Sequence, residues 1–139
     1  MSHAATILAF DTTTRGLLDV TRPIVAWAGD QSATTGLLTV FCRHTSCSLL
    51  IQENAAAEVR SDLEAFFERI APEDPQRYAH DDEGPDDMPA HIRAALTAVQ
   101  LSIPLIGGRL MLGTWQGIYL FEHRRRPHRR ELALHLGFE

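Results

Sequence analysis

The alternation of apolar and polar positions divides the chain into short segments of strand and helix. The strongest strand signal is the apolar run from Gly36 to Arg43, which is dense in residues that favour strands. A continuous run of this kind is typical of a strand buried on both faces. The strongest helix signal extends from Gln52 to Ile70 and stops before Pro72. Its apolar residues recur at helical spacing; they are Val59, Leu63, Phe66, Phe67 and Ile70.

Weaker patterns predict the other elements. Before the central strand we expect two strands and a helix that begins at Thr21 and ends at Gly29, with the segments Thr6–Phe10, Leu17–Val20 and Ile24–Ala28. After the long helix we expect a second helix and four strands, Ala90–Val99, Leu101–Ile106, Arg109–Leu112, Gly117–His123 and Glu131–Leu136. The expected apolar face of this second helix carries Ile92, Ala95, Leu96 and Val99. Gly107-Gly108 is typical of a hairpin turn. This order predicts one α+β domain over residues 1–139, with a largely antiparallel sheet and helices packed on one side.

Charge and composition narrow the classes of function. The formal net charge is −5, which argues against a general nucleic-acid-binding protein. All 13 basic residues are arginines, so a lysine Schiff base and a P-loop lysine are both excluded. No apolar run approaches the roughly 20 residues of a membrane span, and the first residues lack the pattern of a signal peptide. We therefore expect a cytoplasmic protein with no membrane partner.

The two cysteines, Cys42 and Cys47, lie five residues apart. On one extended strand they would be separated by roughly 16 Å, which is beyond the reach of a disulfide, so we expect reduced thiols. Cys47 also follows His44 by three residues, which resembles a pair of nucleophile and base. We interpret it instead as a small thiol packed in the core.

Three polar stretches interrupt the apolar pattern, and we interpret them as one functional site. The first is His44-Thr45-Ser46, directly after the central strand, followed by Glu53 and Asn54 at the expected start of the long helix. The free N–H groups at a helix N-terminus attract anions, so this region is a candidate phosphate site. The structural alternative for Asn54 is a helix cap, and both interpretations stay open.

The second stretch runs from His80 to His91 and holds five carboxylates within the seven residues from Asp81 to Asp87. These carboxylates repel one another unless a positive group lies among them, and imidazole with carboxylate is ordinary metal-ligand chemistry. His80, Asp87 and His91 are therefore candidate ligands of a divalent metal, magnesium or zinc. The alternative is a solvated acidic loop in which Asp87 caps the next helix. For Asp81 and Asp82 we favour this alternative and interpret both as solvated loop residues.

The third stretch, Gly113 to His123, places Trp115 and Gln116 between two glycines. This pattern suits a tight turn or bulge that presents both side chains to a ligand, although core or subunit packing explains the tryptophan equally well. Glu122 ends an apolar strand, where an unpaired carboxylate is costly. The arginine-rich segment from Arg124 to Arg130 is interpreted as a solvated hairpin loop.

At these residues the chain resembles the YjbQ-like family, also described as the secondary thiamine-phosphate synthase family. The resemblance is carried by HTSCSLLIQENA (His44–Ala55), HDDEGPDDMPAHI (His80–Ile92) and IPLIGGRLMLGTWQGIYLFEHR (Ile103–Arg124). With the long helix, it covers nearly the whole chain from about Leu37 onward. The family often has a small residue such as alanine where this chain has Cys47, which argues further against a catalytic thiol.

The resemblance implies a homotrimer with a polar pocket close to the subunit contacts. It also implies a weak thiamine-phosphate synthase activity, which joins a pyrimidine diphosphate to a thiazole phosphate and releases pyrophosphate. The implied site residues fall into three groups: catalytic residues His44, Thr45, Ser46, Glu53 and Glu122; substrate-binding residues Asn54, Trp115 and Gln116; and metal ligands His80, Asp87 and His91.

Three hypotheses of function follow. The first is an enzyme that uses a divalent metal on small phosphorylated heterocycles, with thiamine-phosphate synthesis as the specific case. The second is a metal-dependent hydrolase of another small substrate, in which the metal activates water and Glu53 or Glu122 is the base. The third is a protein that binds a small anion or metabolite without converting it.

Overall fold

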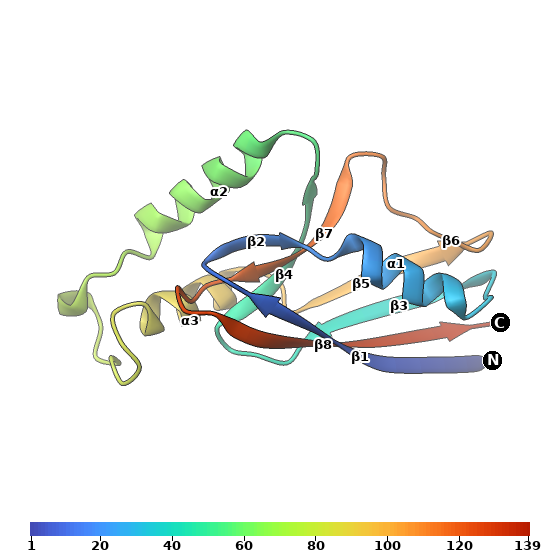
Figure 1. The fold of residues 1–139 in the computed structure, drawn as a ribbon, viewed down its shortest axis with the longest axis horizontal. Coiled ribbons are helices and arrows are strands. Elements are labelled where there is room, and N and C mark those ends of the chain that lie inside the picture. The colour runs from blue at the N-terminus through green and yellow to red at the C-terminus, as the bar shows by residue number, and fades with distance from the viewer.

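The computed structural model describes residues 1–139 and contains two antiparallel sheets around one core (Figure 1). The larger sheet has the spatial order β1 (Ser2–Thr12), β8 (His128–Phe138), β3 (Thr35–Cys42), β5 (Gln100–Ile106) and β6 (Arg109–Leu110). The smaller sheet has the order β2 (Gly16–Asp19), β7 (Gln116–Glu122) and β4 (Cys47–Glu53). The helices are α1 (Thr21–Asp30), α2 (Ala57–Ile70) and α3 (Asp87–Leu96), with a short 3-10 turn at Pro75–Arg77. The expected α+β class is confirmed, with the strands divided between two sheets.

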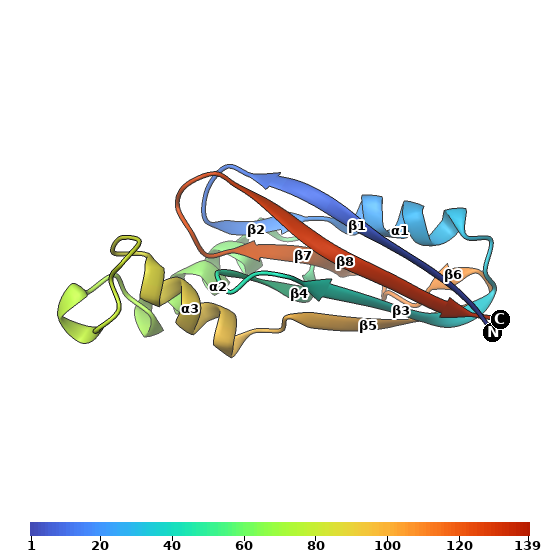
Figure 2. The same cartoon turned by 90° about the horizontal axis from the view of Figure 1, so that it is seen from below.

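The helices are distributed unevenly over the molecule. Helices α2 and α3 and the loops between them gather at one end, and both termini lie at the opposite end (Figures 1 and 2). The core lies where the inner face of the larger sheet meets α1 and the smaller sheet; it includes Ile24, Leu38, Leu49, Leu120 and Leu134. None of the helices is both long enough and apolar enough to cross a membrane.

The expectation that the central strand is buried on both faces is wrong. In β3, Leu38 and Val40 are fully buried, but Leu37 and Phe41 are 47% and 46% exposed. The strand is continuously apolar, yet only one face of the larger sheet is covered within a single chain. The other face therefore presents apolar side chains to the outside.

The expected helix start at Gln52 is also wrong. Residues Cys47–Glu53 form strand β4, which pairs with β7 along its whole length, and α2 begins only at Ala57. Leu49 is fully buried in the core, so long-range pairing and burial outweigh the helical pattern of the segment. Glu53 is consequently not a helix-terminal residue, and its carboxylate accepts hydrogen bonds from the N–H groups of Ala55 and Ala56. The N–H groups of Ala55 and Ala56, which follow Glu53 and Asn54, are therefore occupied by Glu53 and are not free amides of a helix start.

Helix α3 begins three residues earlier than expected and turns a different face inward. The expected apolar face, which included Leu96 and Val99, is wrong, since these side chains are 60% and 40% exposed. The buried face instead carries Asp87, Ala90, Arg93 and Ala94. Two charged residues, Asp87 and Arg93, thus lie on the buried face of α3, although periodicity assigns their positions to the polar side of the helix.

The predicted hairpin turn is confirmed, whereas the predicted separation of the two cysteines is wrong. Gly107 and Gly108 form the expected hairpin turn between β5 and β6, with φ values of 60° and 77° that favour glycine. The segment between β3 and β4 reverses the chain, so Cys42 and Cys47 end up on two strands with their Sγ atoms 3.3 Å apart. The expectation that they lie far apart is therefore wrong, although both are free, buried thiols.

Candidate functional site

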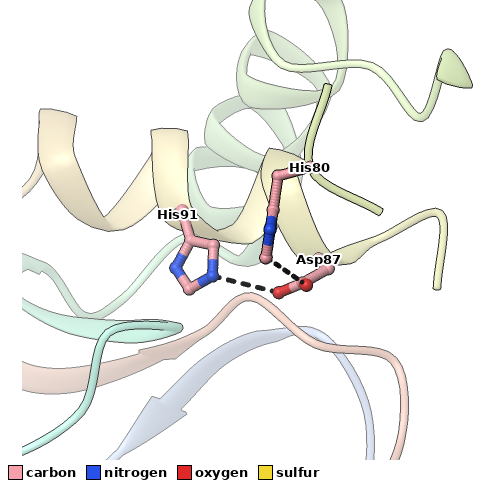
Figure 3. A group of neighbouring side chains, drawn as sticks. All are labelled: His80, Asp87 and His91. Atoms are coloured by element: carbon pink, nitrogen blue, oxygen red, sulfur yellow. Dashed lines mark ion pairs between the residues drawn. The ribbon is translucent and has the colours of Figure 1, made fainter. Parts of the chain in front are cut away.

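Three of the predicted site residues meet at the N-terminal end of α3 (Figure 3). Nε2 of His80 lies 2.7 Å from Oδ2 of Asp87, and Nε2 of His91 lies 3.0 Å from Oδ1 of the same carboxylate. Asp87 and His91 are four residues apart on α3, so they share one face of the helix. His80 reaches the same carboxylate from the preceding loop. One atom from each residue fits within a group whose members are all within 4.8 Å of one another.

The hydrogen bond of His91 to the protein backbone fixes the orientation of its ring. Nδ1 of His91 lies 2.9 Å from the carbonyl oxygen of Thr45, and a carbonyl can only accept, so Nδ1 carries the proton. In a neutral ring, Nε2 then directs a lone pair at the Asp87 carboxylate. Two acceptors that face each other at this distance require a proton or a metal ion between them.

Asp87 itself is only 1% exposed, whereas the side chains of His80 and His91 are 43% and 32% exposed. The cluster therefore has a buried floor and an open side. Asp87 is the first residue of α3 and accepts a hydrogen bond from the N–H of Glu83. The alternative in which Asp87 caps the helix is not observed: Asp86 holds the N-cap position without a side-chain hydrogen bond, and the two oxygens of Asp87 face the histidines.

Arg124 offsets much of the negative charge of the stretch from Asp81 to Asp87. This role was not predicted from the sequence. Its guanidinium binds the Asp86 carboxylate at 3.2 Å and the Glu83 carboxylate at 2.9 Å, and lies 3.6 Å from Asp87. Burial alone raises the pKa of Asp86, but hydrogen bonds from Arg124 and from the Arg125 N–H outweigh burial and hold that pKa below its ordinary value. Arg124 is 7% exposed, so its assignment to a solvated loop is wrong.

Glu122 and Arg130 form a buried pair close to the first polar stretch. Oε1 of Glu122 accepts hydrogen bonds from Thr12 at 2.6 Å and from Nε of Arg130 at 2.7 Å, and Oε2 accepts from two backbone N–H groups. Arg130 also donates to the Ser46 hydroxyl and carbonyl. Glu122 and Arg130 are 1% and 4% exposed, so the solvated-loop assignment is wrong for Arg130 as well. Both oxygens of the Glu122 carboxylate are therefore engaged in hydrogen bonds within the protein.

His44 faces a different element from the other two histidines. Its Nε2 accepts a hydrogen bond from the Glu131 N–H at 2.8 Å, so the ring joins the loop after β3 to strand β8. Burial, and then the nearby Arg130, lower the pKa of His44. Within the first polar stretch, only the backbone carbonyl of Thr45 makes a hydrogen bond to the cluster of His80, Asp87 and His91. Thr45 itself is exposed.

The remaining predicted residues lie at the other end of the β4–β7 pair. The register runs from Cys47 opposite Glu122 to Glu53 opposite Gln116, which separates the two ends by roughly 20 Å. The expectation that all three stretches form one site within a chain is therefore wrong. Gln116 closes its own turn by accepting the Gly113 N–H, and the Asn54 N–H donates to the Trp115 carbonyl. The Trp115 side chain is left exposed.

Comparison with known proteins identifies the family. The family model described as UPF0047 protein YjbQ-like matches residues 6–137. A UPF0047 protein of Synechocystis sp. is 52% identical over 133 residues, which cover 96% of this chain and 90% of that protein. YjbQ of Escherichia coli O157:H7 is 43% identical over 118 residues, 84% of this chain and 85% of that protein.

Solved structures agree with this assignment. A conserved YjbQ/UPF0047 protein of Clostridium acetobutylicum, described as uncharacterised, superposes with a TM-score of 0.87 at 29% identity, covering 95% of this chain and 99% of the other. A conserved hypothetical protein of Thermus thermophilus superposes with a TM-score of 0.82 at 34% identity, covering 93% and 97%. The chain therefore belongs to the UPF0047 family of YjbQ-like proteins.

Proposed function

We propose that His80, Asp87 and His91 hold a divalent metal ion and that the chain is a metal-dependent enzyme acting on a small phosphorylated substrate. The observation that carries this proposal is the pair of imidazole nitrogens directed at one buried carboxylate while the Thr45 carbonyl holds the other nitrogen of His91. A metal ion would accept all three ligands at once. Backbone hydrogen bonds of this kind commonly orient metal-binding histidines.

The donor set favours zinc or a similar transition metal over magnesium. Magnesium prefers oxygen ligands and retains several waters, whereas two histidines and one carboxylate form a common catalytic set for zinc. Three protein ligands leave a fourth position for water or a substrate oxygen. A metal there would act as a Lewis acid on a phosphate oxygen, and Arg124, 3.6 Å from Asp87, would add a second positive group.

Metal binding is the first prediction. Asp87→Asn removes the charge shared by both histidines and should weaken zinc binding by more than about 100-fold, because even a change outside the ligand shell costs about 10–100-fold. Asp82→Asn is the matched control and should change zinc binding far less, since the Asp82 carboxylate is 80% exposed and lies 3.8 Å from Nδ1 of His80, which is too far for a hydrogen bond. Calorimetric titration with zinc measures both variants. Equal affinities in wild type and Asp87→Asn would contradict the proposed ligand set.

The specific reaction that the family resemblance favours is thiamine-phosphate synthesis. In this reaction the metal would offset charge on the leaving pyrophosphate. The assay incubates zinc- or magnesium-loaded protein with the pyrimidine diphosphate and the thiazole phosphate, and it measures thiamine phosphate and pyrophosphate together. Product that is formed by wild type and by Asp82→Asn but not by Asp87→Asn supports the proposal. If the metal-loaded wild type forms no product, this reaction is rejected.

The open fourth position also favours hydrolysis of another phosphorylated or esterified substrate by a metal-bound hydroxide. Glu122 does not supply the base, because its carboxylate is occupied by Arg130 and Thr12. A panel of phosphate monoesters and carboxylic esters, tested with the same three proteins, separates hydrolysis from synthesis. Zinc binding with no turnover in either assay would instead favour a metabolite-binding protein.

The exposed face of the larger sheet supports the homotrimer that the resemblance implies. Apolar side chains on this face include Ile7, Leu37, Phe41 and Ile106, which are between 46% and 58% exposed, and contiguous apolar surface of this kind commonly marks an interface. Phe41→Asp should therefore shift the species from three times 15.5 kDa to the mass of one chain in light scattering. Phe66→Asp is the control, being 45% exposed but on α2. A monomeric wild type would overturn the trimer.

A further inference from the structure

A second charged pocket lies on the other side of α3 from the metal cluster. It has a volume of about 340 Å³ and is bordered by Arg15, Arg93 and Arg125, with Glu68 at its edge and the rings of Phe67 and Phe121 in its wall. Pockets of roughly 300 Å³ and above are the size of small-ligand sites. Arg93 follows His91 by two residues on α3, so the two side chains point about 200° apart around the helix axis.

Arg93 is buried without an adequate anionic partner. It is 2% exposed, its Nε has no hydrogen-bond partner, and its Nη2 donates only to the Ala71 carbonyl at 3.3 Å. The nearest ion pair is with Glu68 at 3.9 Å, and the Glu68 side chain is 56% exposed. Arg124 and Arg130, which are comparably buried, each have carboxylate partners within 3.2 Å. A guanidinium is always charged, so burying one unpaired is costly unless an anion joins it.

Two further arginines converge on the same pocket. Arg15 binds Glu68 and Glu73 at 3.0 Å each, and Arg125 binds Glu73 at 2.8 Å. The lining has three arginines and the carboxylates of Glu64 and Glu68, and Glu73 beside it is a third carboxylate. The charges of the cluster therefore balance, but Glu73 pairs with Arg15 and Arg125 and leaves Arg93 without a close carboxylate. Because Glu68 is mostly exposed, its side chain can rotate into solvent and release Arg15 to an incoming anion.

The apolar part of the wall determines what else the pocket can hold. The rings of Phe67 and Phe121 pack edge to face with centroids 5.4 Å apart, and both residues line the pocket beside the arginines. Such a surface favours a ring or aliphatic group attached to the anionic head. Planar guanidinium groups suit either phosphate or carboxylate oxygens.

We infer that this pocket binds a small molecule with a phosphate or carboxylate head group, held by Arg93 with Arg15 and Arg125, and an apolar body against Phe67 and Phe121. The site is distinct from the proposed metal centre. Arg124 and Arg125 are neighbours in sequence, yet the first binds Asp86 beside the metal cluster and the second binds Glu73 beside the pocket. Ligand binding in this pocket can therefore be tested independently of the proposed enzyme activity.

Calorimetric titration with phenyl phosphate, benzoate and inorganic phosphate tests the inference. We expect phenyl phosphate or benzoate to bind more tightly than inorganic phosphate, and Arg125→Gln to weaken binding about 10-fold through loss of one charge-assisted hydrogen bond. Arg129→Gln is the control, because Arg129 is 71% exposed and lies outside the pocket. Preference between the two ring compounds identifies the head group as phosphate or carboxylate.

The variants also separate this pocket from the metal centre. Asp87→Asn should bind the same probes with unchanged affinity, whereas Arg93→Gln should abolish binding, with circular dichroism and thermal melting to confirm that it folds. If Arg93→Gln does not fold, the result for Arg125→Gln tests the inference alone. The Arg125 side chain is 59% exposed, so its replacement should not prevent folding. No binding of any probe at millimolar concentration would overturn the inference. Binding that is lost in Asp87→Asn but kept in Arg125→Gln would also overturn it.

Discussion

Glu122→Gln should lower the free energy of unfolding by about 3–5 kcal/mol, because it leaves the buried Arg130 guanidinium without a counter-charge. The substitution preserves the shape of the side chain and removes the charge. Wild-type Glu122 is 1% exposed and accepts hydrogen bonds from Thr12, from Arg130 and from two backbone N–H groups. Burial alone raises the pKa of Glu122, but the bonds from Arg130 and Thr12 outweigh it and hold the pKa below its ordinary value.

The matched control is Glu131→Gln. Glu131 lies on the same strand as Arg130 but pairs with Arg43 at 3.4 Å, with both side chains more than 40% exposed, so its loss should cost no more than about 1 kcal/mol. Urea unfolding measures both variants. A double variant, Glu122→Gln with Arg130→Met, should regain part of the stability because no charge is left buried and unpaired. Equal losses for Glu122→Gln and Glu131→Gln would show that the buried pair is not a major source of stability.

Stability should also fall by about 2 kcal/mol when the pH is lowered from about 8 to about 5, because of His123. This residue is fully buried, its Nε2 lies 2.8 Å from the Ser48 hydroxyl, and its Nδ1 has no partner. Burial, and then the charge of Arg93, lower the pKa of His123 to about 3. Between the unfolded pKa of about 6.5 and the folded pKa of about 3, the unfolded chain binds a proton that the folded chain does not, so acid favours unfolding. His44, whose pKa is also lowered, contributes with the same sign.

The test compares unfolding free energies at several pH values above about 5, where the carboxylates Glu122 and Asp86, with their lowered pKa values, do not yet contribute. His123→Phe should lower overall stability but flatten the pH dependence in this window. His135→Gln serves as the control, because His135 is exposed on β8, and it should keep the wild-type slope. A wild-type stability that is constant across this window, or an unchanged slope in His123→Phe, would contradict the role of His123.

The cluster of His80, Asp87 and His91 could be predicted because two of its three members are fixed by local spacing. Asp87 and His91 are four residues apart, which places them on one helix face whatever the rest of the chain does. His80 enters from a short loop that leads into the same helix. The structure adds the Thr45 carbonyl, which selects the tautomer of His91 across 46 residues of sequence. A backbone acceptor at that distance leaves no pattern in the sequence.

The buried arginines could not be anticipated in the same way. Arg124 and Arg130 stand in a basic, proline-containing segment that is typical of solvated loops, yet their partners are carboxylates 38 and 8 residues away. Arg93 was missed because it occupies a position on α3 that helical periodicity treats as polar surface. The sequence held one indication of a buried arginine. The surplus of carboxylates from Asp81 to Asp87 required a positive group among them, and Arg124 supplies it.

The sequence by itself determined the elements whose signals are local: the central strand, the two-glycine hairpin, the two later helices in outline, and the spacing of Asp87 and His91 on α3. It also identified the family through three ordered motifs. The tertiary structure decided which faces are buried, that Cys47–Glu53 is a strand, and that Trp115 lies at the far end of β7 from the cluster of His80, Asp87 and His91. These outcomes depend on strand register and on pairing between distant charges, whose free energy exists only once the chain topology brings the partners together.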